Sequence, residues 1–438
     1  MLIAIYSITF DMLSSVMPQR SNTRLELDQL KKKETPPPID CLPVELLLKI
    51  LSFALVDDDR VCGRTRMVSA HVSRHWRDVI LNCPAFWTTI ELYPGRTPPF
   101  IKAHVERSRN YLVDINIHHW FSGEEFIVFP KLLDAIIPCA HRWRSFTVNS
   151  NRTPIMHLIE KELENVASFP SLTRAIFDTL QNDVSFDSKF LAPEKTPLLE
   201  TLQIRASGSF QDAITSFDAT HVTLNLTHPW SPPSPFSLSL ASEKMTSLKL
   251  VGTTYGWNSL HPNSLHLPRL QSLHIEIDPS NPLLQAIVSP NLSRLDYMYP
   301  SDMISEVFDQ ITSKFPNLRY FGFRSSEEVD GSEARAICTV FPGVSHVELD
   351  IQNISAFFGL TNGSCAADRW VCLEHLSFSS YDQLPSNDLV QWLKRRKHRG
   401  LPMLQVELRS SHMTRMAEPN PLDTLPKYCT LRLLERIP

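Results

Sequence analysis

Hydrophobic residues follow two different patterns along this chain, one near the N-terminus and another through the remainder. Residues 39–55 carry apolar side chains three and four positions apart, which is the spacing of one face of an α-helix. That face comprises Leu42, Leu46, Ile50 and Phe53. Pro43 suits the first turn of such a helix, and Asp40 is available to cap it. The pattern therefore predicts an amphipathic helix over residues 39–55.

A second helical pattern covers residues 65–81, after an acidic stretch at 57–59 that we expect to be a solvated loop. Its apolar face comprises Val68, Val72, Trp76, Val79 and Ile80, and the closing residues include Cys83, Pro84, Phe86 and Trp87. A hairpin of two short helices carries more apolar surface than it can bury alone. We expect the surplus to be covered either by the rest of the chain or by a separate protein.

The residues of this hairpin resemble the F-box, and the trailing Pro84, Phe86 and Trp87 are typical of the large fungal F-box families. The resemblance rests on Leu42-Pro43, Glu45-Leu46-Leu47, Ile50-Leu51, Val72-Ser73-Arg74 and Trp76-Arg77. An F-box is a helical module that binds the Skp-type adaptor of cullin–RING (SCF-type) ubiquitin ligases. Position by position, the resemblance implies an adaptor-binding surface of Leu42, Pro43, Leu46, Ile50, Leu51, Val72 and Trp76. The linker at residues 56–67 is longer and more acidic than the family pattern.

From Trp87 onward a second pattern, Φ-x-x-Φ-x-Φ with Φ hydrophobic, returns again and again, often with proline two residues ahead. Its clear copies begin at Leu199, Met245, Leu270, Leu292, Leu318, Val344 and Leu373, and weaker ones at Trp87, Leu112, Trp143 and Leu172; a last one near Leu404 is irregular. From Met245 onward the clear copies begin 22 to 29 residues apart, which is the period of leucine-rich repeats. Each copy would form one short strand whose two inward side chains need neighbouring copies to bury them.

These copies resemble leucine-rich repeats, with helices expected between some of them at residues 301–315 and 386–399. The Asn that normally follows the strand is replaced here by Ser207, Thr253, Asp278, Pro300, Ser326 and Gln352. We therefore expect an α/β fold, an N-terminal helical F-box followed by an irregular leucine-rich-repeat-like solenoid. A mixed α/β domain with separate strands is the alternative. The expected domains are a tail with a short charged helix (1–38), the F-box (39–92) and a substrate-binding repeat domain (93–438).

In a solenoid, the residues on either side of each central strand hydrophobe face away from the core. The candidates for binding a target there are Arg205, His274, Arg294, Tyr320, Arg324, His346 and His375. A mixed polar, charged and aromatic surface of this kind suits a protein partner. The alternative for any one of them is an ordinary solvated strand position.

Composition and charge narrow the class of function. The 438 residues include 42% hydrophobic and 21% charged residues and carry a net charge of −4, so we expect no nucleic-acid partner. Eight scattered cysteines without a CxxC pair favour a reducing compartment, cytoplasmic or nuclear. The basic run at 394–399 is either a nuclear-localisation signal or the C-terminal turn of a helix, and we favour the helix. The apolar first 17 residues contain Asp11 and no preceding basic residue, so we expect neither a signal peptide nor a membrane anchor.

Motifs for catalysis or cofactor binding are not found in the sequence. It contains no GxSxG, GxxxxGK[ST] or GxGxxG, and the pair His71 and His75 has the spacing of zinc ligands but no third partner. We therefore expect no cofactor, no metal and no enzymatic activity, although a hydrolase in the C-terminal region is a rival. The favoured function is a substrate-recognition adaptor of an SCF-type ubiquitin ligase. The alternative is a leucine-rich-repeat scaffold that acts outside any ligase.

Overall fold

The chain forms two compact units. Unit 1 comprises Met1–Thr89 and Lys102–Tyr111, and unit 2 comprises Ile90–Ile101 and Leu112–Pro438, whereas we expected a boundary at residue 92. The computed structural model describes residues 42–56, 68–118, 120, 127–150, 153–178, 189–205, 218–226, 244–253, 260–298, 307, 314–325, 328–350, 353–361, 363–378, 387–410 and 425–435. The helix expected within residues 1–38 and the acidic loop at 57–59 lie outside these ranges.

Unit 1 is built from helices. They are α3 (Val44–Val56), α5 (Arg74–Asn82), the 3-10 helix η2 (Pro84–Trp87) and the C-terminal part of α6 (Pro98–Arg107). Helix α3 agrees with the first predicted helix and begins just after Pro43, whose carbonyl accepts the N–H groups of Leu46 and Leu47 at 3.0 Å.

The helix predicted at 65–81 is interrupted in the described residues: Val68 and Ser69 are helical, residues 70–72 form turns, and α5 begins at Arg74. Ser73 ends the preceding turns because its backbone is extended (φ −152°, ψ 170°) and its Oγ accepts the Trp76 N–H at 3.2 Å. A serine that satisfies one of the free N–H groups of the first turn is a strong helix start. The cap therefore prevailed over the apolar spacing.

The core of unit 1 contains Leu47 and Leu51 of α3, Ile80 of α5 and Trp87. Trp87 joins these parts, because its Nε1–H donates to the carbonyl of Ile80 at 2.9 Å and its ring meets the His104 ring edge-on at 4.8 Å. A buried tryptophan with its N–H satisfied is a stable centre for a small core.

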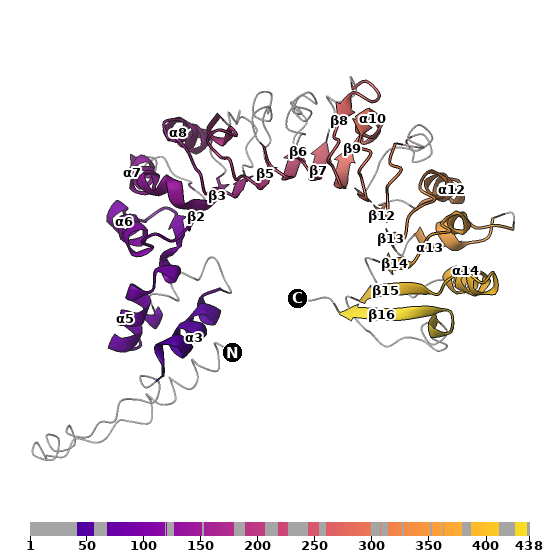
Figure 1. The fold of residues 1–438 in the computed structure, drawn as a ribbon, viewed down its shortest axis with the longest axis horizontal. Helices are drawn as coiled ribbons and strands as arrows, with labels where there is room; N and C mark the ends of the chain where they lie inside the picture. Colours follow the sequence, from indigo (N-terminus) through magenta and orange to yellow (C-terminus); the bar gives the residue numbers. More distant parts are fainter. Residues whose placement is uncertain are drawn as a thin grey trace, which may run out of the picture. The chain divides into compact units, whose positions relative to one another are not determined.

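Unit 2 contains a single long sheet whose strands follow chain order (Figure 1). Within the described residues the sheet has 14 strands, and every pairing from β2 to β16 is parallel. The strands are β1 (Thr89–Leu92), β2 (Val113–Ile117), β3 (Trp143–Asn149), β4 (Arg174–Asp178), β5 (Thr201–Arg205), β6 (His221–Leu226), β7 (Ser247–Thr253), β9 (Ser272–Asp278), β11 (Arg294–Met298), β12 (Tyr320–Arg324), β13 (His346–Leu349), β14 (His375–Phe378), β15 (Leu404–Ser410) and β16 (Cys429–Glu435). A separate two-stranded parallel sheet pairs β8 (Leu265–His266) with β10 (Ile287–Val288).

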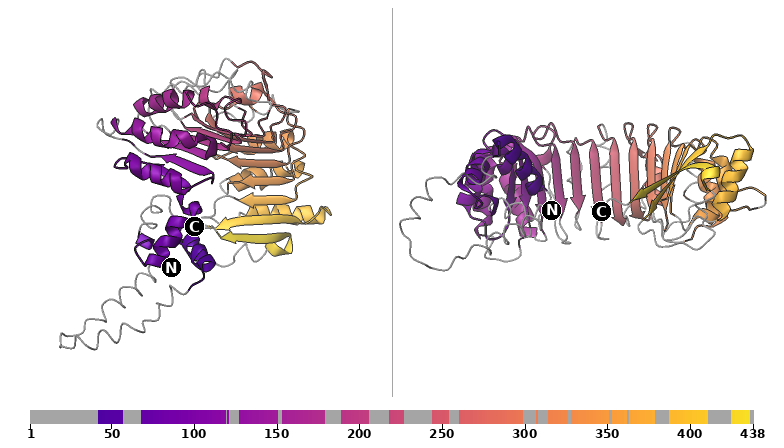
Figure 2. Two further views of the ribbon diagram at one scale, coloured as in Figure 1. Left: turned by 60° about the vertical axis from the view of Figure 1, so that its left-hand side comes forward. Right: turned by 90° about the horizontal axis from the view of Figure 1, so that it is seen from below.

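The described helices of unit 2 lie on one face of this sheet, and none of them covers the other face, which we call the open face (Figures 1 and 2). They are α7 (Phe129–Ile136), η4 (Ile137–Arg142), α8 (Thr153–Glu164), η5 (Lys189–Leu191), α10 (Asn281–Ala286), α12 (Gly331–Val340), α13 (Ile354–Phe358), η9 (Ala366–Arg369), α14 (Asn387–His398) and η11 (Leu425–Lys427). Helix α14 confirms the helix predicted at 386–399 and stops before Gly400, which has the positive φ (+72°) of a helix C-terminus. Most of the helix expected at 301–315 lies outside the described residues.

The hydrophobic positions of the predicted copies align across the sheet in two buried rows. Leu273 pairs with Leu295, which pairs with Phe321, and each of the three is 0% exposed. The second row continues in the same way through Ile275, Tyr297 and Phe323. The helical face of the sheet is thus the core that the pattern predicted.

The sequence pattern did not predict two strands of the long sheet, and one predicted copy is irregular. Strand β6 was missed because its leading hydrophobe is only Ala219, which is nonetheless fully buried. Strand β16 was missed as well. At β2 the register shifts next to Val113, so that Val113 is buried and the predicted anchor Leu112 is 42% exposed.

Backbone and hydroxyl groups link neighbouring strands of the sheet at the residues that precede each strand. The Thr246 carbonyl accepts two N–H groups, from Gln271 at 2.8 Å and Ser272 at 3.0 Å. The same paired arrangement recurs from strand to strand. The hydroxyl of the residue before a strand often donates to a carbonyl before the neighbouring strand too, as that of Thr246 does to the carbonyl of Thr220. These bonds satisfy backbone groups that burial would otherwise penalise.

Candidate functional site

Helix α3 of unit 1 has two apolar stripes that face different surroundings. Leu47 and Leu51 are 0% and 1% exposed and form part of the core. Leu46, Ile50 and Phe53, spaced four and three residues apart, are 51%, 45% and 69% exposed. We call these three residues the apolar stripe.

The other predicted adaptor-binding residues divide between surface and core. Val72 is 53% exposed and Pro43 is exposed, whereas Leu42 is half-buried. Trp76 is also half-buried, because it packs against the core of unit 1. Leu51 was expected on the docking surface and is buried instead, since α3 turns it towards Ile80 and Trp87.

Phe53 was not among the predicted docking residues, although its spacing from Ile50 could have indicated it. Exposed apolar residues are concentrated in this part of the molecule. Of the fourteen exposed large apolar side chains in the described residues, six lie between Val44 and Val72. Such a concentration on a small folded unit marks an interaction surface.

In unit 2, flat side chains stack across four neighbouring strands on the open face. The guanidinium of Arg294 lies 3.8 Å from the centre of the Tyr320 ring, and that ring stacks on His346 at 4.7 Å. His346 in turn stacks on His375 at 5.5 Å. The strand register aligns all four positions, so the stack follows directly from the parallel pairing.

Two residues further along the strands, a row across the sheet holds two carboxylates with a glycine between them. Asp296 and Glu348 stand on either side of Gly322, and each is only 6% exposed. Arg294 donates to both oxygens of Asp296, from Nε at 2.7 Å and Nη2 at 3.1 Å. Glu348 accepts the hydroxyl of Tyr320 at 2.7 Å and Nη2 of Arg324 at 2.9 Å. Each of these weakly exposed carboxylates thus has hydrogen-bonding partners, which offset the cost of its burial.

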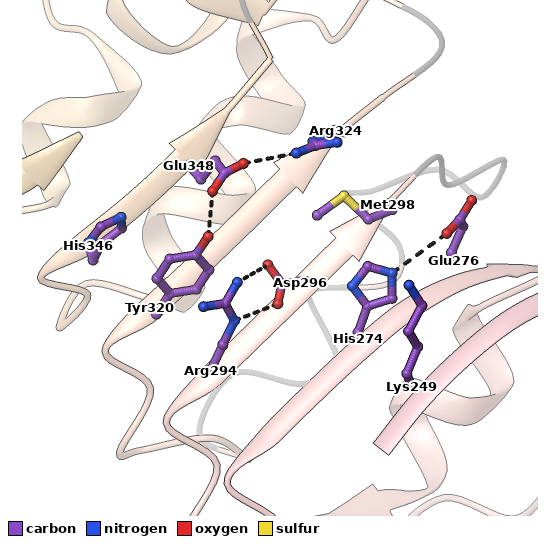
Figure 3. A pocket seen from close by; sticks show the side chains of 10 residues that line it. All are labelled: Lys249, His274, Glu276, Arg294, Asp296, Met298, Tyr320, Arg324, His346 and Glu348. Atoms are coloured by element: carbon purple, nitrogen blue, oxygen red, sulfur yellow. Dashed lines mark hydrogen bonds and ion pairs between the residues drawn. The ribbon is translucent and has the colours of Figure 1, made fainter. Parts of the chain in front are cut away.

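These side chains line a cavity of about 560 Å³ on the open face (Figure 3). Its lining is Lys249, His274, Glu276, Arg294, Asp296, Met298, Tyr320, Arg324, His346 and Glu348. The structure thus brings together five of the seven predicted target-binding residues.

The other two predicted residues lie outside this lining. Arg205 pairs with Asp178 at 3.2 Å, and His375 ends the stack. Sequence reasoning missed Lys249 and Gly322, although each lies between two buried strand hydrophobes, as the predicted residue His274 does.

Burial is the largest cause of the pKa shifts of two histidines and a tyrosine in the cavity. It lowers the pKa of His274, with a further lowering from Lys249, and it lowers the pKa of His346, with a further lowering from His375. Both imidazoles are therefore mostly uncharged at neutral pH. Burial, and then the hydrogen bond to Glu348, raise the pKa of Tyr320, so that its hydroxyl remains a donor.

The described residues offer little for other chemistry. No group of three or more His, Cys, Asp or Glu side chains in them is arranged to hold a metal ion. His71 lies in the turns before α5 and His75 lies within α5, so the two do not share a helix. Among the helices of the described residues, none combines the length and apolar character needed to span a bilayer.

Comparison with known proteins gives one result for unit 1. Residues 39–93 match the family model described as F-box-like. A search of curated proteins found no match. F-box domains belong to adaptor proteins instead of enzymes, and in general they bind Skp-type adaptors of SCF-type ubiquitin ligases. The match therefore supports an F-box protein whose F-box-like domain covers residues 39–93.

Proposed function

We propose that this chain is the substrate-recognition subunit of an SCF-type ubiquitin ligase. In this proposal the F-box-like domain binds the Skp-type adaptor, and the open face of unit 2 binds a target protein. The observation that carries the proposal is the apolar stripe, which lies within the F-box-like match.

The adaptor contact is centred on the apolar stripe and extends to Pro43 and Val72. Complete burial of a Leu, Ile or Phe side chain contributes about 1.5–3 kcal/mol, so covering three that are roughly half exposed contributes several kcal/mol. Leu51 supports this surface from beneath, through its packing in the core. Trp76 contributes the part of its ring that the core does not cover.

Unit 2 acts as a leucine-rich-repeat-like solenoid that presents its open face to the target. Parallel strands in chain order, with buried rows in register, support this interpretation. The tyrosine, methionine and arginine side chains in the lining of the cavity support target binding, because aromatic residues, Met and Arg are enriched at protein interfaces.

Catalysis by this chain is not needed for the proposed function. Binding an adaptor and a target on one chain raises the effective concentration of the ligase near the target. The associated enzymes then transfer ubiquitin, and this chain determines which protein receives it.

Co-purification with a Skp-type adaptor tests the proposal. The intact chain should retain the adaptor, and the double variant Leu46→Asp/Ile50→Asp should lose it. Val371→Asp is a matched control, because Val371 of unit 2 is 60% exposed and lies outside the F-box-like match. Retention of the adaptor by the double variant would overturn the docking surface. An adaptor complex that never acquires the cullin would favour a scaffold outside the ligase.

A further inference from the structure

We propose that the cavity over Gly322 anchors the target by taking an uncharged carboxamide side chain, that of glutamine or asparagine. This inference rests on the proposed function, since it names the group that the open face of unit 2 recognises. Three features carry it: the gap at Gly322, the balance of charge in the lining, and unused hydrogen-bonding groups at one end.

Gly322 creates the space. It stands between Asp296 and Glu348 in the row of residues that face away from the core. A Cβ atom placed on Gly322 would lie 2.5 Å from Oδ1 of Asp296 and 3.3 Å from Cε1 of Tyr320. Any larger residue here would therefore fill the floor of the cavity and displace the Asp296 carboxylate from Arg294.

The charges of the lining cancel. Three cations (Lys249, Arg294 and Arg324) face three carboxylates (Glu276, Asp296 and Glu348). Arg294 is paired with Asp296 and Arg324 with Glu348, while Glu276 lies 3.6 Å from Nε2 of His274. With His274 and His346 largely uncharged at neutral pH, the lining carries no net charge, so a charged ligand would leave the cavity with a net charge.

Hydrogen-bonding groups of both kinds remain at the end of the cavity formed by β7, β9 and β11. Lys249, His274 and Asp296 are in register on these strands. Lys249 is exposed and has no ion-pair partner among the described residues. Asp296 accepts two bonds from Arg294, and a carboxylate offers about four acceptor positions.

A carboxamide matches this set. Its carbonyl oxygen can accept a hydrogen bond from the Lys249 ammonium, and its NH₂ group can donate to Oδ1 of Asp296 above Gly322. An aliphatic side chain would leave these groups without partners, which costs more than the contact contributes. A carboxylate or an ammonium satisfies only one of the two sides and brings an unbalanced charge.

The experiment is a peptide array in which one fixed residue, Gln, Asn, Glu, Lys, Arg or Leu, stands in a randomised background. The purified full-length chain should favour Gln and Asn over the other residues by about tenfold, which corresponds to about 1.4 kcal/mol. Gly322→Ala should abolish this preference. Gly331→Ala is the matched control, because Gly331 opens helix α12, outside the cavity, and a Cβ there meets nothing closer than 3.4 Å.

Lys249→Gln provides a second, independent test on the same array. Lys249 is exposed, so its replacement should leave the fold intact, and the lining gains one net negative charge. The preference should then move from Gln and Asn towards Lys and Arg. It also decides the matter if Gly322→Ala does not fold. A wild-type preference for a charged or apolar residue, no preference at all, or a preference unchanged by Lys249→Gln overturns the proposal.

Failure of this inference is separable from failure of the proposed function. Adaptor co-purification measured on the same samples reports on unit 1 alone. Adaptor binding without a carboxamide preference rejects the anchor pocket only, and a carboxamide preference without adaptor binding rejects the ligase assignment only.

Discussion

The two candidate surfaces of this chain differ in chemistry. The apolar stripe of unit 1 consists of Leu46, Ile50 and Phe53, whereas the cavity of unit 2 is lined by ion pairs, imidazoles and a tyrosine. Both are exposed parts of elements whose opposite faces are buried. On α3 the exposed positions carry aliphatic and aromatic side chains, whereas on the strands they carry charged and polar ones that pair with their neighbours.

This difference corresponds to two kinds of binding task. Apolar burial is strong but hardly directional, so it suits a single partner that is always the same. Paired charges and hydrogen bonds contribute less net energy, yet they penalise every group that fails to match them. In the proposed function these two tasks are the binding of a shared adaptor and the binding of a particular target.

If each unit is stabilised by its own core, removing a large buried side chain from the core of unit 2 should destabilise that unit alone. This change should have the largest effect on stability. Phe323 is 0% exposed and its ring lies 6.2 Å from those of Tyr297 and Phe357. Phe323→Ala should therefore lower the stability of unit 2 by about 3–5 kcal/mol. Denaturant unfolding measures this loss, and adaptor binding should persist. Loss of adaptor binding in the folded variant would show that the units are not independent.

The second prediction separates the two stripes of α3. Leu51→Ala removes a fully buried side chain and should lower the stability of unit 1 by about 2–5 kcal/mol. Leu46→Ala, at an exposed position of the same helix, should change stability by less than about 0.5 kcal/mol. Thermal unfolding of the two variants provides the measurement. Equal losses would mean that the stripes are not distinct.

The cap of α5 gives a smaller effect on the same unit. Ser73→Ala removes the side-chain acceptor of the Trp76 N–H and should cost about 0.5–2 kcal/mol of stability. Ser73→Asp retains an acceptor and serves as the control, since aspartate caps helices equally well. If the alanine and aspartate variants unfold at the same temperature, the cap does not determine where α5 begins.

The smallest prediction concerns pH and the stack in unit 2. The folded-state pKa of His346 lies below its ordinary value of 6.5, because of burial and then of the neighbouring His375. At pH values between the folded-state pKa and the ordinary pKa of His346, the unfolded chain binds more protons than the folded chain. The free energy of unfolding therefore falls as the pH falls. His346→Gln should flatten this dependence below about pH 6.5, the ordinary pKa of histidine.

The surroundings of His346 decide how large that effect is. Tyr320, His375 and Ser377 contact its ring, Glu348 and Glu407 favour its protonation, and Arg294 opposes it. Unfolding curves at a series of pH values measure the slope. A variant as sensitive to acid as the wild type would assign the dependence to other groups.

Much of the fold could be predicted because local spacing and burial agree. The rows through Leu295 and Tyr297 are hydrophobic at the positions that the parallel register buries. Helix α14 was readable from its polar start, its basic last turn and the Gly400 that follows. Strand β6 was not, because the small Ala219 fills its leading core position.

The sites were less predictable, because tertiary packing determines them. Leu46 and Leu51 are equally apolar, and only the docking of α5 and Trp87 decides which one faces the core. The cavity likewise depends on contacts between strands, such as the bond from Tyr320 to Glu348, and on the missing side chain of Gly322. Spacing along one strand carries no information about either.

Calorimetric titration of the intact chain with a Skp-type adaptor tests the central claim most directly. The claim predicts binding with a negative heat-capacity change, the mark of apolar burial, and a loss of about 2–4 kcal/mol in binding free energy for Leu46→Ala/Ile50→Ala. An unchanged dissociation constant for that folded variant would contradict it.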